Sequence, residues 1–117
     1  RVENGYMPEA PVLATQNALT SCDLTLDEID AVKTHNPFAV NDVYFIKKTG
    51  YDSGKMNNYG CTLIWGHPQG PMGIRGIIEL IEELVIRGGG IGLFVGCAAG
   101  DTGLAVVIEV NDSQIDK

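Results

Sequence analysis

The sequence predicts a layered α/β domain in which a mixed β-sheet is covered by helices. Three observations support this prediction. Apolar residues recur at helical spacing between Ile74 and Val85. Two apolar runs, 91–95 and 104–110, flank a glycine-rich turn at 96–103 and are typical of buried strands. Helical and strand patterns alternate along the chain, as they do in layered α/β domains.

The first third of the chain predicts a helix, a short turn and a strand. Residues 1–9 form a polar lead-in, after which Pro11 suits the first turn of a helix that ends near Ser21 or Cys22. Thr25 and Glu28 have the spacing of a capping box, so a short helical turn is expected there. The segment Ala31-Val32-Lys33-Thr34-His35 then predicts a short strand that ends at a polar residue.

The middle of the chain predicts a second helix and a second strand. Asn36 is expected to cap a helix over 38–48 with Pro37 at its first position, and Gly50 stops that helix. The apolar run 61–65, flanked by glycines, predicts a buried strand.

The segment 75–87 predicts the clearest helix. Arg75–Glu79 and Glu83–Arg87 are opposite charges four residues apart, and three consecutive glycines follow the helix. Because this helix is apolar on nearly all sides, we expect it to be buried between layers. Taken with the preceding elements, this helix leads us to expect one domain over residues 10–112, followed by a tail over 113–117.

Composition excludes several classes of function. The 117 residues suffice for a modest core, and no apolar run is long enough to span a bilayer. The formal net charge of −7 disfavours a nucleic-acid partner, because phosphate contacts need clustered Lys and Arg. Cys22, Cys61 and Cys97 have no regular spacing, which fits a reducing cytoplasm better than a disulfide framework.

Three side chains that can carry chemistry follow predicted strands, where open α/β sheets place their sites: His35, His67 and Cys97. Each also has a structural interpretation. His35 can cap a helix, His67 can be a turn histidine beside Pro68, and Cys97 can be a small buried hydrophobe. Together they suggest acid–base chemistry, since an imidazole titrates near neutral pH and can take a proton from a thiol.

The segment from about Pro8 to Val110 resembles the end of the C-terminal domain of the thiolase family. Gly66-His67-Pro68-Gln69-Gly70 is similar to the family's G-H-P-x-G motif, and the turn 96–103 is similar to its C-x-G-G-G-x-G turn. His35-Asn36-Pro37-Phe38 stands where many thiolases have N-E-A-F, and is closer to the H-D-C-F of the sterol-carrier-protein type.

The resemblance implies an acyltransferase that acts on coenzyme A thioesters by Claisen condensation or thiolysis, with no tightly bound cofactor and no metal. It implies that His67 activates the acyl-accepting cysteine and that Cys97 shuttles a proton. His35 replaces the family's Asn at an oxyanion, and the N–H of Ala99 is a second oxyanion donor. Gly66 and Gly100 are expected to let the backbone approach the substrate.

The sequence also departs from the family pattern. Ala99 and Asp101 replace glycines of the turn, which predicts a divergent member. Nothing in the chain matches the nucleophilic cysteine, which thiolases carry in their N-terminal half. The resemblance therefore implies a longer gene product or a second subunit, inactivity of this chain alone, and a homo-oligomer for the complete protein.

Three alternatives remain open. A phosphate- or nucleotide-binding module is favoured by the glycines of 66–73 before a helix, although the spacing matches neither G-x-G-x-x-G nor a P-loop. A metal site from His35, His67, Cys61 and Cys97 lacks the close paired spacing of structural zinc sites. A non-catalytic thiolase-like scaffold fits the departures at Ala99 and Asp101.

Overall fold

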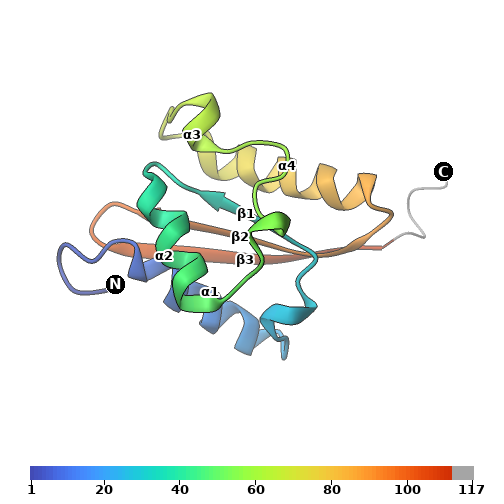
Figure 1. Ribbon diagram of the computed structural model, residues 1–117, viewed down its shortest axis with the longest axis horizontal. Coiled ribbons are helices and arrows are strands. Elements are labelled where there is room, and N and C mark those ends of the chain that lie inside the picture. The colour runs from blue at the N-terminus through green and yellow to red at the C-terminus, as the bar shows by residue number, and fades with distance from the viewer. Residues whose placement is uncertain (112–117) are drawn as a thin grey trace.

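The computed structural model describes residues 1–111 and contains a three-stranded mixed sheet in the order β1-β2-β3 (Figure 1). The strands are β1 (Ala31–His35), β2 (Gly90–Ala98) and β3 (Thr102–Val110). β1 pairs with β2 in parallel, with His35 opposite Gly96, and β2 pairs with β3 in antiparallel orientation. The predicted tail, 113–117, lies outside the described residues.

Helices cover both faces of the sheet (Figure 1). α1 (Glu9–Ser21) and α2 (Ala39–Thr49) lie on one face, and α4 (Met72–Ile86) lies on the other. The connections contain a short helix, α3 (Thr62–Trp65), and the 3₁₀ turns η1 (Leu26–Glu28) and η2 (Ser53–Lys55). The predicted layered α/β class with a mixed sheet is confirmed. Within the part of the chain that is described, no helix is both long and apolar enough to cross a membrane.

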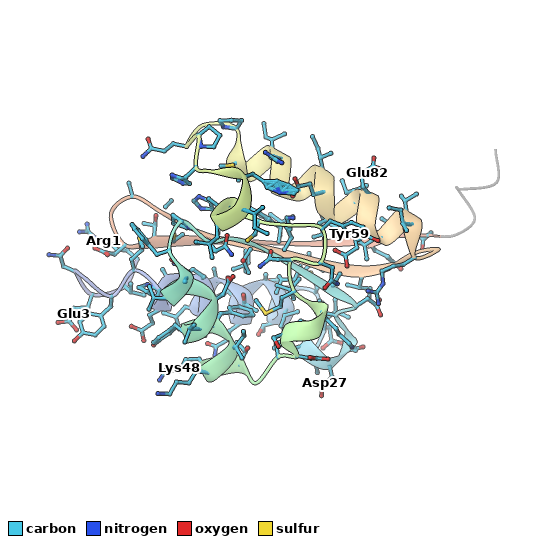
Figure 2. The ribbon with its side chains drawn as sticks, turned by 45° about the horizontal axis from the view of Figure 1, so that its top comes forward. Arg1, Glu3, Asp27, Lys48, Tyr59 and Glu82 are labelled. Atoms are coloured by element: carbon cyan, nitrogen blue, oxygen red, sulfur yellow. The ribbon has the colours of Figure 1, made fainter. Side chains whose placement is uncertain are left out.

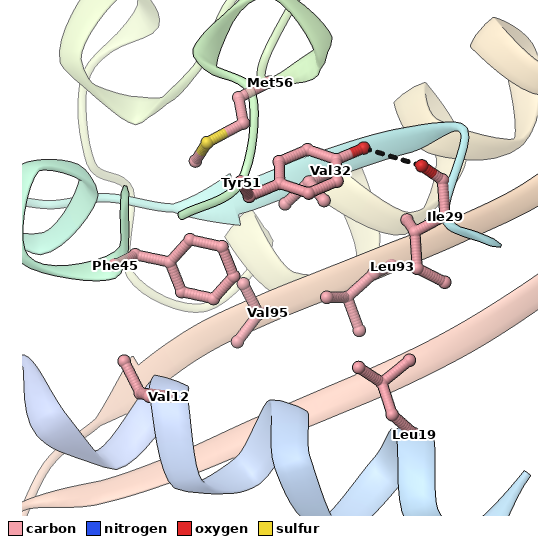
Figure 3. Packing of buried hydrophobic residues seen from close by; sticks show 9 residues of the cluster. All are labelled: Val12, Leu19, Ile29, Val32, Phe45, Tyr51, Met56, Leu93 and Val95. Carbon is pink, nitrogen blue, oxygen red and sulfur yellow. Dashed lines mark hydrogen bonds between the residues drawn. The ribbon is translucent and has the colours of Figure 1, made fainter. Parts of the chain in front are cut away.

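Side chains alternate across the sheet, so each face has its own core. Nine buried residues form the core on the face that α1 and α2 cover (Figure 3): Val12, Leu19, Ile29, Val32, Phe45, Tyr51, Met56, Leu93 and Val95. On the opposite face, Ala31 and Phe94 pack against Leu80 and Leu84 of α4. Charged side chains such as Asp27, Lys48 and Glu82 stand on the outside of the molecule (Figure 2).

Several predicted helix ends are confirmed. Thr25 and Glu28 form the capping box, with the Thr25 N–H donating to the Glu28 carboxylate at 2.7 Å. Gly50 ends α2 in the left-handed conformation, at φ 71°. The N–H of Gly89 donates to the Leu84 carbonyl at 2.9 Å and closes the end of α4.

The predicted capping role of Asn36 is wrong. Phe38 occupies the N-cap position of α2, and the Asn36 side chain is fully buried. Its amide donates to the Asp42 carboxylate at 2.5 Å. Asp42 also accepts a hydrogen bond from the Thr34 hydroxyl at 2.7 Å, so its carboxylate joins α2 to the end of β1. Hydrogen bonding to the half-buried Asp42 carboxylate therefore outweighs the local capping preference of an Asn-Pro pair.

The predicted strand at 61–65 is also wrong, because this segment contains the short helix α3. A short apolar run does not distinguish a strand from a helical turn. Here the backbone closes on itself, since the N–H of Trp65 donates to the Cys61 carbonyl at 3.1 Å. Leu63 and Ile64 are exposed by 50% and 75%, so the segment is not a buried strand.

Helix α4 was expected to be buried on all sides, and in this chain it is not. Met72, Gly76, Leu80 and Leu84 face the sheet and are buried. A second apolar row remains exposed, with accessibilities of 68%, 52%, 37% and 37% for Ile74, Ile78, Ile81 and Val85, in that order. The apolar residues do recur at helical spacing, but the described residues cover only the side of α4 that faces the sheet.

Candidate active site

The histidines of the two motifs meet above the end of the sheet. His35 is the last residue of β1, and His67 lies in the exposed loop between α3 and α4. Their Nε2 atoms are 2.6 Å apart, and the rings meet edge to edge, with centroids 4.8 Å apart and planes inclined by 20°. The structure thus brings together two residues that the sequence places in separate motifs.

The surroundings of His35 determine which of its nitrogens carries a proton. Its Nδ1 lies 3.1 Å from the backbone carbonyl oxygen of Cys97, which can only accept. Nδ1 is therefore the protonated nitrogen of the neutral ring, and Nε2 carries the lone pair. The short contact then requires His67 to donate its Nε2–H to His35.

Burial keeps His35 in this neutral form. Removal of the ring from water lowers the pKa of His35, and a positive charge on neighbouring His67 would lower it further. The hydrogen bond to the Cys97 carbonyl acts in the opposite direction but does not outweigh burial. At neutral pH the ring therefore serves as a hydrogen-bond acceptor for His67.

Cys97 lies at the end of β2, beside the two rings. The residue is 7% exposed, and burial raises the pKa of its thiol. The side-chain amide of Asn41 in α2 donates to Cys97 Sγ at 3.6 Å, which favours the thiolate and opposes the effect of burial. Asn41 was not among the predicted site residues, although its spacing from Phe45 on a predicted helix places both on the inward face.

A cavity of about 500 Å³ joins these groups. Its walls come from the N-terminal segment, the two histidine motifs and the β2–β3 turn: Met7, His35, Pro37, Phe38, His67, Gln69, Cys97, Ala98 and Ala99. Met7 was not expected at the site, and its place in an irregular lead-in left no pattern to detect. No Lys or Arg lines this cavity within the described residues.

The predicted glycine positions lie at the margins of the site. Gly66 and Gly100 do not line the cavity, whereas Ala99 does. The Gly66 N–H donates to the Thr62 carbonyl at 3.0 Å and so closes the α3 turn. Asp101 follows in the turn with a φ of 57°, a left-handed conformation that glycine adopts at lower cost.

The described residues contain no cluster of three or more His, Cys, Asp or Glu side chains that could hold a metal ion. Cys22, Cys61 and Cys97 are free thiols that range from exposed to buried. Two imidazoles and a buried thiol beside an apolar cavity can transfer protons and stabilise negative charge on oxygen.

Residues 1–110 match the thiolase C-terminal domain family. The chain belongs to the thiolase family. The family resemblance of the sequence motifs is thereby confirmed, and the structure shows that those motifs surround one cavity.

This thiolase domain is similar to proteins with two different names. It is 37% identical over 108 residues to an acetyl-CoA acetyltransferase of Escherichia coli, spanning 92% of this chain and 27% of that protein. It is 33% identical over 116 residues to a 3-ketoacyl-CoA thiolase of Alteromonas mediterranea, spanning 85% and 27% of the respective lengths. The thiolase domain thus corresponds to about a quarter of these relatives.

Solved thiolase structures share the fold. The acetyl-CoA acetyltransferase of Bacillus anthracis superposes with a TM-score of 0.89 at 31% identity, over 92% of this chain and 27% of that one. Human mitochondrial 3-ketoacyl-CoA thiolase in complex with CoA gives 0.86 at 32% identity, over 90% and 27%. These similarities confirm the α/β fold of the thiolase domain.

Proposed function

We propose that this chain supplies the histidine-and-cysteine part of a thiolase active site that acts on coenzyme A thioesters. The observation that carries the proposal is the convergence of His35, His67 and Cys97 on one cavity, with the two imidazoles 2.6 Å apart. The complete enzyme transfers an acyl group by thiolysis of a 3-ketoacyl thioester or by the reverse Claisen condensation. Relatives named acetyl-CoA acetyltransferase and 3-ketoacyl-CoA thiolase support this reaction class.

In this proposal His67 is the general base for a nucleophilic cysteine in the rest of the enzyme. Its Nε2–H is directed to His35, so the other ring nitrogen holds the lone pair that takes the thiol proton. The resulting imidazolium keeps its Nε2–H on the neutral His35 ring. His35 thus orients His67 and stabilises its charged form.

Cys97 transfers the second proton. Because burial raises the pKa of its thiol, Cys97 rests in the protonated form. In thiolysis, the nucleophilic cysteine attacks the 3-keto carbon, the bond between Cα and Cβ breaks, and the departing carbanion takes the proton of Cys97. The Cys97 thiolate then takes the proton from the thiol of incoming coenzyme A, and the coenzyme A thiolate attacks the acyl-cysteine. The released nucleophilic thiolate takes back the proton held by His67, which restores the starting state.

We assign two groups to the stabilisation of negative charge on substrate oxygen atoms. Ala99 lines the cavity two residues after Cys97, and we assign its backbone N–H to the thioester oxygen. We assign a second oxygen, or its bound water, to the ring N–H that His67 gains when it takes the thiol proton, because the other N–H groups of the histidine pair already donate to His35 and to the Cys97 carbonyl. Gly66 and Gly100 shape the loops behind these donors.

The N-terminal half of a thiolase is needed to complete the site. The chain spans 27% of its relatives, and its cavity has no cationic lining for the phosphates of coenzyme A within the described residues. The exposed row Ile74, Ile78, Ile81 and Val85 is a large apolar surface for a protein that must stay in solution. We assign this row to contact with the N-terminal thiolase half, in a homo-oligomer located in a reducing compartment such as the cytoplasm.

A chimera tests the proposal. This chain would replace the matching quarter of the Escherichia coli acetyl-CoA acetyltransferase, and acetoacetyl-CoA thiolysis would be measured by absorbance. We expect turnover well above that of the same protein truncated before the replaced segment. A chimera that folds and oligomerises but shows no more turnover than its His67→Ala variant would refute the catalytic role.

The second candidate is a non-catalytic thiolase-like scaffold. The observation that favours it is the turn beside Cys97, where Asp101 adopts a φ of 57° at a position the family fills with glycine. A folded, inactive chimera that regains activity on Asp101→Gly and Ala99→Gly would assign the loss to this turn. Without such recovery, the scaffold interpretation would stand.

A further inference from the structure

A lysine is buried beneath the candidate site. Lys33 lies in the middle of β1 and is 3% exposed, which is unusual for a lysine without charge partners. Alternation along the strand puts Ala31, Lys33 and His35 on the face that α4 covers. Lys33 therefore lies on the same side of the sheet as the candidate catalytic His35, two residues away.

The Lys33 ammonium has partners from two other segments. It donates to the Gly60 carbonyl at 2.5 Å and forms an ion pair with Glu79 in α4. Glu79 also accepts from Arg75 Nε at 2.8 Å. Burial would raise the pKa of Glu79, but the hydrogen bonds from Lys33 and Arg75 outweigh it and keep the carboxylate ionised.

The same cations hold the Trp65 ring. Lys33 Nζ lies 5.7 Å from the ring centroid, and the Arg75 guanidinium lies 4.1 Å from it. The indole rests directly on Gly60, where any Cβ would overlap the ring. The buried indole N–H has no hydrogen-bond partner among the described residues, so packing and the two cations fix the ring. We call Lys33, Gly60, Trp65, Arg75 and Glu79 the Lys33 cluster.

The loop that carries His67 has few other anchors. Residues 66–71 are all exposed, and Met72 is the next buried residue along the chain. Trp65 lies two residues before His67, so the position of its ring sets where the loop leaves α3. The Lys33 cluster joins that point to β1, which carries His35, and to the first turns of α4.

We propose that the Lys33 cluster is a positioning device that holds His67 against His35, with Lys33 and Trp65 as its principal positioning residues. The role in catalysis rests on the proposed function, whereas the role in geometry does not. A purely structural lysine would stabilise the fold without affecting the distance between the two rings. The proposal requires that the rings separate when the cluster is disrupted in a chain that remains folded.

The experiment measures the nuclear Overhauser effect between the ring protons of His35 and His67 in this 117-residue chain. The variants are Lys33→Met and Trp65→Ala, and Lys47→Met, at an exposed position of α2, is the matched control. Circular dichroism and the methyl spectrum of the core report folding. We expect the ring-to-ring signal to be lost in both cluster variants and unchanged in the control.

Each outcome decides the proposal. A ring-to-ring signal that persists in folded Lys33→Met would overturn it. If Lys33→Met does not fold, Trp65→Ala decides: loss of the signal in a folded chain supports the proposal, and its retention overturns it. If neither variant folds, these residues serve stability and the proposal fails.

The catalytic consequence is measured separately in the chimera. Lys33→Met there should lower kcat by about 100-fold with little change in KM, because misplacing a catalytic group by about 1 Å has an effect of that order. Loss of the ring-to-ring signal together with an inactive parent chimera would uphold the positioning role and refute the proposed function. An active chimera in which Lys33→Met leaves kcat unchanged would refute the catalytic consequence alone.

Discussion

His35 and His67 share one hydrogen bond between their Nε2 atoms, at 2.6 Å, although 32 positions separate them in the chain. The Cys97 carbonyl fixes the direction of that bond, because it engages Nδ1 of His35 and leaves His67 as the donor. The two rings should therefore not be interchangeable: one is the oriented acceptor and the other is the base.

Substitutions of the histidines should have unequal effects. In the chimera, His67→Ala should lower kcat by a factor on the order of 1,000, as expected for loss of a general base. His35→Asn should retain more activity than His35→Ala, because an amide oxygen can still accept from His67. Steady-state thiolysis rates would check this order, with Lys47→Met as the control. Equal activity of His35→Asn and His35→Ala would contradict the orienting role.

The thiol of Cys97 should react slowly with alkylating agents, although it lies at the candidate site. Burial raises the pKa of its thiol, so less of it is thiolate at a given pH, and its alkylation rate should keep rising to higher pH than for an ordinary thiol. Mass spectrometry after timed iodoacetamide treatment between pH 7 and about 10 would measure the extent of alkylation of Cys97 and of Cys22. The exposed Cys22 is the internal control. Faster modification of Cys97 than of Cys22 at neutral pH would contradict this assignment.

Two glycines of α4 should respond oppositely to alanine. A methyl group added at Gly73 would meet only open space, so Gly73→Ala, in the first turn of α4, should stabilise the chain by at most about 1 kcal/mol through helix propensity. A Cβ at Gly76 would lie 2.5 Å from Cε2 of the buried Phe94 ring. Overpacking of this kind costs roughly 1–3 kcal/mol, so Gly76→Ala should be destabilising overall. Urea denaturation would measure both, and stabilisation by Gly76→Ala would show that Phe94 moves freely.

Tyr51 should make the fold sensitive to alkali. Its hydroxyl donates to the Ile29 carbonyl at 2.9 Å inside the core (Figure 3), and burial raises the pKa of Tyr51 from 10.0 to about 12. An ionised phenol is thus easier to form in the unfolded chain. The contribution of the neutral hydroxyl is complete below pH 10 and is lost as the pH rises through about 12.

Tyr51→Phe tests this dependence. It should cost about 1 kcal/mol at pH 7, where the hydrogen bond is lost. The difference in unfolding free energy between wild type and Tyr51→Phe should shrink as the pH rises above 10. Tyr59→Phe, at a residue that is 52% exposed, is the control. A difference independent of pH would rule out Tyr51 as the source of alkaline sensitivity.

Local patterns predicted most of the fold because local interactions decide those elements. The strand Ala31–His35 was predicted with its observed bounds, and the capping box at Thr25 formed as its spacing indicated. The error at 61–65 arose because a four-residue helix and a short strand share the same apolar pattern. Trp65 packing on Gly60 and Arg75 is a tertiary effect that no local window contains.

The candidate site was predictable as a set of residues but not as a geometry. His35, His67 and Cys97 could be named because each follows a predicted strand or lies in a glycine-rich motif. The contact of His35 with His67, the amide of Asn41 on Cys97 and the position of Met7 depend on how distant segments pack. The exposure of Ile74, Ile78, Ile81 and Val85 could not be predicted either, because apolar spacing does not show which side of α4 meets the sheet.

The parallel pairing of β1 with β2 gives the site a late place in the order of folding. β2 and β3 form a hairpin of neighbouring segments, whereas β1 reaches β2 only after α2, α3 and α4 have been enclosed in a long loop. Closing such a loop costs entropy before any contact rewards it. We therefore expect Cys97 to acquire its strand partner before His35 does when the domain refolds.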